Sequence, residues 1–453
     1  MIIVFVLGYA AIALEHPIKV DKAASALIIG GLGWALLALG IIDIVNFEIV
    51  ANKFAVFQEW YKVKFPGKEI TELNFLKYEL SHHLIDIAEI LFFLLGAMTI
   101  VELVDAHQGF TIITNKITTN NRIKLLWILS IITFFFSAVL DNLTTAIVMA
   151  ALLPKIIKGK KDLWMFAGMI ILSANAGGAW SPIGDVTTTM LWIADKVTVP
   201  MLLYYVFIPS VVCMIVPVYI ASFLKPFKGN LDKMDNDESS ITKIGTRMLW
   251  LGLSAILFVP FFKVFTGLQP YVGMMLSLAI VATFAEIYSG TKFNISTPNE
   301  DSIMHSKSPV HSALTKIELP SILFFLGILM AVAALESIGY LFEFAQYLET
   351  VIPDIRIVAG FLGLGSAVID NVPLVAASIG MFSQPVDDSL WHLIAYAAGT
   401  GGSVLVIGSA AGVVAMGMEK IEFFWYLKKI GWLAFLGFLA GFITFVLLEA
   451  YIL

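Results

Sequence analysis

The chain has 453 residues, of which 59% are hydrophobic and only 14% are charged, and its mean hydropathy is +0.89. Ordinary soluble domains do not reach such values, so lipid is expected to solvate most of the chain. The formal net charge of −6 provides no basic patch of the kind that neutralises phosphates, so nucleic acid is not an expected partner.

The apolar stretches run for about 18 to 25 residues, the length that a helix needs to cross a hydrocarbon core of roughly 30 Å. Helices are expected because unpaired backbone groups are too costly in lipid, and the alternation typical of outer-membrane strands is absent. With Gly, Pro and charge clusters taken as breaks, the predicted segments are 1–14, 23–42, 84–104, 124–152, 163–194, 199–224, 247–264, 268–288, 317–337, 355–383, 389–416 and 424–452. The predicted fold is an all-α polytopic membrane protein with about ten to thirteen transmembrane segments.

Polar connections separate these segments. Residues 43–82 are mixed in charge, and 225–246 and 291–316 have the composition of solvated loops. The stretches 105–121 and 339–352 are short and amphipathic, which favours helices at the membrane interface. We divide the chain into N-terminal spans with an amphipathic connection (1–82), a first repeat (83–224), a linker with two connecting spans (225–316) and a second repeat (317–453).

Two sets of polar residues recur along the chain in the same order. Residues Ser137–Asn142 read SAVLDN, and residues Ser366–Asn371 read SAVIDN 229 positions later. After each Asp-Asn pair, Ala174–Asp185 matches Ala398–Ser409 at a spacing of 224. Chance similarity between apolar sequences does not predict this order. Duplicated halves that meet at a central site are typical of secondary transporters, so we predict two inverted repeats.

Several predicted spans contain residues that interrupt helices: Pro154, Pro182, Pro373, Gly177–Gly178 and Gly401–Gly402. We expect discontinuous helices and re-entrant hairpins there. A broken helix exposes backbone groups at membrane depth, which is tolerated where protein or a water-filled cavity satisfies them. Packing of small residues between helices is the alternative for each Gly pair, but the polar residues that flank both pairs favour a site.

Asp141 and Asp370 each lie in an apolar stretch, where a carboxylate costs roughly 2.5 to 3.5 kcal/mol on insertion scales. A hydrogen-bonded Asp that joins helices is the structural alternative, but buried ionisable groups usually mark ion pathways. Nearly all side chains near the breaks offer oxygen, and no Lys or Arg lies among them: Asp141, Asn142, Thr144, Thr145, Ser173, Asn175, Asp185, Thr187, Thr188, Asp370, Asn371, Thr400, Ser403 and Ser409. Such a set suits a hard cation, whereas an anion would be expected to meet Arg, Lys or a helix N-terminus.

Exchange of Na⁺ for H⁺ needs one group that holds either ion. A desolvated carboxylate suits this task, because burial favours its protonated form and a nearby cation favours its ionised form. We therefore predict that Asp141 and Asp370 bind the transported Na⁺ and the proton in turn, with Asp185 as a third candidate.

His82 and His83 precede Asp86 and Glu89 at the start of a predicted span. They could sense pH, because His titrates near neutrality. The alternative, which has at least equal weight, is that they lie at the membrane interface and form hydrogen bonds to headgroups or water. No metal-ligand spacing, phosphate loop or nucleophile elbow stands out. Neither an enzyme nor a cofactor is predicted.

Several blocks of the chain resemble the NhaD-type sodium/proton antiporters of the ion transporter superfamily: Ser137–Thr145, Ser173–Thr189, Ser366–Leu374, Ala397–Gly412 and Ser81–His83. The resemblance extends over nearly the whole chain. It implies inverted repeats with two re-entrant hairpins, a homodimer in a bacterial inner membrane, and exchange of Na⁺ or Li⁺ for H⁺. The positions that it makes functional are Asp141, Asn175, Asp185, Thr187, Thr188, Ser366, Asp370 and Ser403, with Asn142 and Asn371 beside them.

Two other kinds of transporter on the same scaffold stay open. Asp-Asn-Val-Pro-Leu at 370–374 is shared with arsenite permeases, which makes an oxyanion permease one alternative. The other is a sodium-coupled carboxylate symporter, although the Ser-Asn-Thr hairpin tip of those relatives is absent here. The first half has Thr144 where the second has Pro373, so the two half-sites are unequal. The sequence does not decide which of them holds the ion. A membrane enzyme or receptor would need a catalytic constellation or a soluble sensory domain, and neither is visible.

Overall fold

The computed structural model describes residues 2–13, 18–44, 50–110, 119–157, 159–231, 242–289, 308–317, 319–352, 354–367, 371–406 and 408–451. Throughout these ranges the regular elements are helices, and the one β-bridge they contain joins Asn121 to Asn230. Eight of the described helices are long and apolar enough to cross a membrane, and four shorter apolar helices accompany them. The prediction of an all-α polytopic membrane protein is confirmed.

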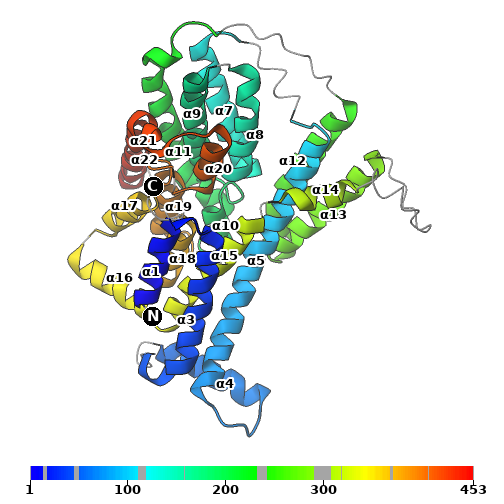
Figure 1. The fold of residues 1–453 in the computed structure, drawn as a ribbon. Coiled ribbons are helices and arrows are strands. Elements are labelled where there is room, and N and C mark those ends of the chain that lie inside the picture. Colours follow the sequence, from blue (N-terminus) through cyan, green and yellow to red (C-terminus); the bar gives the residue numbers. More distant parts are fainter. Residues whose placement is uncertain are drawn as a thin grey trace.

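The N-terminal part contains α1 (Ile2–Ala13), α3 (Lys22–Ile44), α4 (Ala51–Lys64) and α5 (Glu72–Ala106). With 12 residues, α1 is about 18 Å long and falls short of the full span predicted at 1–14. With 35 residues, α5 is about 52 Å long, because Thr71 caps it well before the predicted start at residue 84. It runs from α4 at one end of the molecule past α12 and α14 (Figure 1).

One of the two predicted interfacial helices is confirmed as a helix, α16 (Tyr340–Val351). The other was predicted at 105–121 and falls largely outside the described residues. Residues 107–110 form a turn after α5, and the next described helix begins at Arg122.

The segment predicted at 124–152 breaks at Asp141. Helix α7 (Arg122–Leu140) ends there because Asp141 has a left-handed φ of 70°, and α8 (Asn142–Ile156) begins at the next residue. The Asp141 carboxylate caps α8 by accepting the Thr144 backbone N–H at 2.7 Å. Pro154 does not make the interruption that we predicted from the sequence, because α8 continues past it to Ile156.

The other helices follow in the predicted order. The first half continues with α9 (Lys160–Gly178), the turn 179–185, α10 (Val186–Ile193) and α11 (Val199–Ser222). The centre holds η1 (Lys225–Phe227), α12 (Lys243–Thr266), α13 (Pro270–Ser289), α14 (Pro309–Lys316) and α15 (Leu319–Ser337). The C-terminal part holds α17 (Ile355–Gly365), α18 (Asn371–Met381), α19 (Ser389–Gly401), the turn residues 402–406 and 408–409, α20 (Ala410–Glu419), α21 (Phe423–Tyr426), η3 (Leu427–Gly431) and α22 (Trp432–Tyr451).

Broken helices pack crosswise near the two turns. Helix α8 packs on α20, and α18 packs on α10, so each lies against the helix that follows the other turn. Glycine lets α9 approach α7 and α19 approach α17, since a Cβ at Gly177 or Gly401 would overlap the carbonyl oxygen of Phe134 or of Gly363. This packing places both turns beside the N-termini of α8 and α18.

Candidate ion-binding site

Asp185 accepts hydrogen bonds from both halves of the chain. It precedes α10, and its Oδ1 accepts the Thr187 backbone N–H at 2.9 Å and the Thr187 hydroxyl at 3.0 Å. Its Oδ2 accepts the Asn142 amide at 2.5 Å and the Asn371 amide at 3.4 Å. All four side chains are buried, and Asp185 is only 2% exposed. One carboxylate thus meets the N-termini of α8 and α18.

Asn175 extends these contacts into the second turn. Its Oδ1 accepts the Asn142 amide at 3.1 Å, and its own amide donates to the hydroxyls of Ser403 at 2.8 Å and Ser409 at 2.9 Å. These side chains are buried as well. We call the whole set the Asp185 network: Asn142, Asn175, Asp185, Thr187, Asn371, Ser403 and Ser409.

Asp141 adjoins the Asp185 network through its neighbour Asn142. Its carboxylate oxygens accept the Thr144 N–H at 2.7 Å and the Thr144 hydroxyl at 2.8 Å. One turn into α8, the Thr145 hydroxyl is buried and has no hydrogen-bond partner among the described residues. A buried oxygen of this kind retains an acceptor for a cation, as do the carboxylate and amide oxygens nearby.

Some predicted site residues hold the backbone instead of contacting the Asp185 carboxylate. The Thr188 hydroxyl donates to the Ser181 carbonyl at 2.7 Å, which closes the turn 179–185. The Ser366 hydroxyl donates to the Ala398 carbonyl at 3.3 Å and so joins the end of α17 to α19. Backbone carbonyls also accept the hydroxyls of Ser173 and Thr400.

Asp370, the second predicted ion carrier, lies outside the described residues. The predicted pairing of Asp141 with Asp370 therefore stays a prediction. The following residue, Asn371, is described, and its contact with Asp185 brings the second half of the chain to the site.

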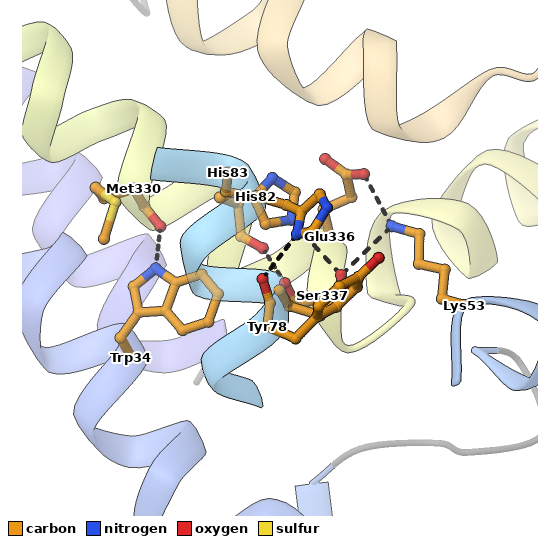
Figure 2. A network of polar contacts seen from close by, with 10 residues as sticks. Trp34, Lys53, Tyr78, His82, His83, Met330, Glu336 and Ser337 are labelled. Carbon is orange, nitrogen blue, oxygen red and sulfur yellow. Dashed lines mark hydrogen bonds and ion pairs between the residues drawn. The ribbon is translucent and has the colours of Figure 1, made fainter. Parts of the chain in front are cut away.

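His82 and His83 lie within α5, which begins a full ten residues earlier than His82, and not at the start of a helix. The His82 Nδ1 is 3.0 Å from the Tyr78 carbonyl oxygen, and the His83 Nε2 is 3.8 Å from Glu79 Oε2. Figure 2 shows both histidines beside Tyr78 and Glu336. His83 also lines a cavity of about 360 Å³ between α5, α10, α15 and α18, which we call the His83 cavity.

Acidic side chains line the His83 cavity: Asp86, Glu89, Asp195 and Glu336. Lys53 of α4 lies 3.1 Å from Glu336 Oε1 (Figure 2). It also lies 3.9 Å from Glu79 Oε2. Burial lowers the pKa of Lys53, but the carboxylates of Glu336 and Glu79 outweigh burial and raise this pKa above its ordinary value. Lys53 therefore stays cationic beside the cavity. The sequence analysis missed it, because nothing in a polar connection indicates which span a lysine will contact.

A second cavity of about 340 Å³ lies between α5, α8 and α20. It is lined by Thr144, whose hydroxyl donates to Asp141, so this Thr144 cavity approaches the Asp185 network from α8. Glu102 and Asp105 line it too, and Lys316 Nζ is 4.0 Å from Glu102 Oε2. Each cavity thus combines acidic side chains with nearby lysines that pair with them, and at the His83 cavity Lys263 also lies 2.7 Å from Asp195 Oδ1.

Comparison with known proteins gives consistent matches along the chain. The model of the citrate transporter family, CitMHS, matches residues 9–392. Sodium/proton antiporter 1 of Arabidopsis thaliana is 41% identical over 449 residues, which cover 97% of this chain and 71% of that protein. Sodium/proton antiporter 2 of the same plant is 36% identical over 98% of both chains. The Na(+)/H(+) antiporter NhaD of Vibrio cholerae is 30% identical over 99% of this chain and 91% of the relative.

The family match spans the broken helices and the first turn, and the antiporter matches cover 97 to 99% of the chain. The protein is a multi-pass membrane transporter and not an enzyme. The chain belongs to the citrate transporter (CitMHS) family and groups with the NhaD-type sodium/proton antiporters.

Proposed function

We propose that the chain exchanges Na⁺ or Li⁺ for H⁺ through a site centred on Asp185. The proposal depends on one observation, the contact of a buried carboxylate with Asn142 and Asn371 at the N-termini of two broken helices. Carboxylate, amide and hydroxyl oxygens are the ligands that hard cations prefer, and a carboxylate that takes up a proton releases its cation. Na⁺ and H⁺ then compete for one group, which produces exchange. The names of the relatives support the same activity.

The residues around Asp185 divide by their contacts. Asn142, Asn175, Asn371, Ser403 and Thr187 position the carboxylate or offer oxygen to the ion, and Thr188 and Ser366 brace the backbone. Asp141 is a second carboxylate beside them that binds the ion or the proton. We assign the same role to Asp370, because it occupies the corresponding place in the repeated Asp-Asn motif.

We also propose that the chain consists of two inverted repeats. Contacts that recur at the two spacings found in the sequence support this. The Ser137 hydroxyl donates to the Ala174 carbonyl, and the Ser366 hydroxyl donates to the Ala398 carbonyl. The serines are 229 positions apart and the carbonyls 224. The close contact of a glycine in α9 with α7 recurs between α19 and α17 at the same spacings.

The His83 cavity and the Thr144 cavity are lined by residues at equivalent positions of the two repeats. We propose that these cavities are the access routes to the ion site from the two sides of the membrane. Met190 of α10 lines the His83 cavity, and Val414, 224 positions later on α20, lines the Thr144 cavity. Along α5, His83 and Glu102 line different cavities and are separated by about 28 Å of helix, close to the thickness of a hydrocarbon core. Movement of the halves would open each route in turn.

Two alternatives to cation exchange remain. The description of the family, citrate transporter, is consistent with a carboxylate symporter, and the other alternative is an arsenite or other oxyanion permease. Either anionic substrate would have to bind beside the Asp185 carboxylate. Two negative charges at contact distance repel each other strongly in a buried site. A cation meets no such obstacle, so the contacts of Asp185 favour cation exchange.

Dye-reported collapse of ΔpH in everted vesicles that contain the protein tests the proposal. NaCl and LiCl are expected to dissipate the gradient, and KCl is the control for chloride and ionic strength. Parallel vesicles receive radiolabelled citrate or arsenite. Uptake of either anion without any response to Na⁺ or Li⁺ across the pH range would overturn cation exchange.

Glu336 is expected to attract Na⁺ at the His83 cavity and Lys53 to oppose it. Glu336→Gln should raise the KM for Na⁺ about two- to fivefold, and Lys53→Gln should lower it by a similar factor, the range expected for partly exposed charges. The measurement is the Na⁺ dependence of ΔpH collapse. Lys62→Gln, which removes an exposed lysine from the same helix, is the matched control. Equal KM values for Lys53→Gln and Lys62→Gln would contradict a role for Lys53 at this cavity.

We propose a homodimer in a bacterial inner membrane as the setting of this transporter, as the resemblance implies. The Vibrio cholerae relative supports a bacterial location, and the Arabidopsis thaliana relatives support a plant membrane. Fractionation of the source cells decides between these locations.

A further inference from the structure

A basic cavity lies where several helices end, apart from the Asp185 network. Its volume is about 820 Å³, and residues from the starts of α7 and α9, from η1 and from η3 line it. Among the described residues that line it, one is acidic, Asp162, and five are basic: Arg122, Lys161, Lys225, Lys428 and Lys429. We call it the basic cavity.

Arg122 engages the acidic residue of this cavity. Its Nη2 is 2.6 Å from Asp162 Oδ2, and its Nη1 donates to the Pro226 carbonyl at 2.7 Å, which holds η1 against α7. No ion pair joins the four lysines of the basic cavity to an acidic side chain within the described residues. The basic cavity therefore has several positive charges on its walls that no carboxylate among the described residues neutralises.

Tryptophan side chains and an apolar surface adjoin these charges. Trp425 and Trp432 line the basic cavity, and Trp432 begins an exposed apolar face of α22 that continues through Leu436, Leu439 and Ile443. These residues are spaced three or four apart and so lie on one side of the helix. Trp and Lys at the ends of membrane helices mark the level where lipid headgroups meet hydrocarbon.

We propose that the basic cavity binds the phosphate of an anionic phospholipid. Basic pockets between transmembrane helices suit such headgroups. The lysines hold the phosphate, and an acyl chain lies along the apolar face of α22. A free phosphate ion shares the first contact but not the second, so the structure favours the lipid.

The basic cavity is connected to the second turn of the ion site. Tyr426, which precedes η3, donates its hydroxyl to the Ser403 carbonyl at 2.8 Å. Gly431 lies so close to the turn that a Cβ there would be 2.8 Å from the Val404 carbonyl oxygen. A headgroup held by the lysines of η3 therefore braces this turn at Ser403 and Val404. This consequence for transport rests on the proposed function, whereas the binding itself does not.

Native mass spectrometry of the purified full-length protein tests the binding. The protein is equilibrated with equal amounts of phosphatidylglycerol and phosphatidylcholine, and a parallel sample also receives inorganic phosphate. The wild type is expected to retain phosphatidylglycerol in preference, and Lys428→Gln/Lys429→Gln to weaken it by roughly fivefold for each lysine removed. Lys62→Gln/Lys68→Gln removes the same charge from exposed positions near α4 and is expected to behave as the wild type.

Equal retention of phosphatidylglycerol by the two double variants would overturn the site. Equal retention of both lipids by the wild type would overturn the preference for an anionic headgroup. Displacement of the lipid by millimolar inorganic phosphate would show a free-anion site instead. If the η3 variant does not fold, Lys161→Gln/Lys225→Gln makes the same test on the opposite wall. None of these results depends on the ΔpH assay, so the failure of one proposal leaves the other standing.

Discussion

Asp185→Asn is expected to reduce Na⁺-dependent collapse of ΔpH by about a hundredfold or more, the effect of removing one partner of a buried charge pair. Asn can still accept the Thr187 N–H and hydroxyl, so the start of α10 should stay folded. The variant loses the negative charge that balances the transported cation and the group that takes up the proton. The new amide also faces the amide donors of Asn142 or Asn371, which leaves hydrogen bonds unmade.

Purified protein in proteoliposomes provides the measurement, with Na⁺ added at several concentrations. Asp388→Asn is the matched control, because Asp388 caps α19 by accepting the Leu390 N–H at 3.0 Å and Asn caps a helix equally well. We expect this control to transport as the wild type does. Exchange by Asp185→Asn at the same level as the control would contradict a central charge at Asp185.

Asp141→Asn is expected to lower exchange at least tenfold, about the effect of weakening one hydrogen-bonded charge contact, while leaving the protein folded. Asn has the same shape as Asp, so it meets the same backbone strain at φ 70° and ψ 161°, and it can accept the Thr144 N–H that begins α8. The ionisable group is therefore lost without the helix cap. Asp141→Ala removes the cap as well and should cost about 1 kcal/mol of stability relative to Asp141→Asn.

Transport and thermal unfolding of the two Asp141 variants separate an ion carrier from a helix cap. A carrier predicts that both variants lose exchange and that only the Ala variant loses stability. Wild-type exchange by Asp141→Asn, combined with a lower melting temperature for Asp141→Ala, would leave Asp141 as a cap alone. Asp185 would then carry the ion without it.

The two polar positions at the broken helices could be predicted from the sequence, but the helix start at Asn142 could not, since 124–152 was predicted as one segment. A carboxylate and an amide inside an apolar stretch are too costly to lie there without polar contacts, so the two Asp-Asn pairs marked special positions. The structure begins α8 at Asn142, and the described residues of α18 start at Asn371. Hydropathy likewise predicted most of the spans, because helix length and lipid exposure follow directly from apolar composition.

The sequence could not show which carboxylate gathers the contacts. Asp185 was the third candidate, and its place between Asn142 and Asn371 depends on how α8 packs on α20 and α18 on α10. Packing between distant helices leaves no local pattern in the chain. The same reason applies to Lys53, which is separated from Glu336 by 283 positions. The start of α5 was missed for another reason, since its first turns are polar and hydropathy does not include them in a span.

The crosswise packing of α8 on α20 and of α18 on α10 has a consequence for the origin of the fold. Each broken helix packs on a helix of the other half as well as on its own, and Asn371 at the start of α18 donates to Asp185 of the first half, so the second half on its own would leave this amide without that partner in hydrocarbon, at a cost of several kcal/mol. On the proposed duplication, an ancestral single unit would have completed this contact by pairing with a second copy inserted in the opposite direction, before gene fusion fixed their relative orientation.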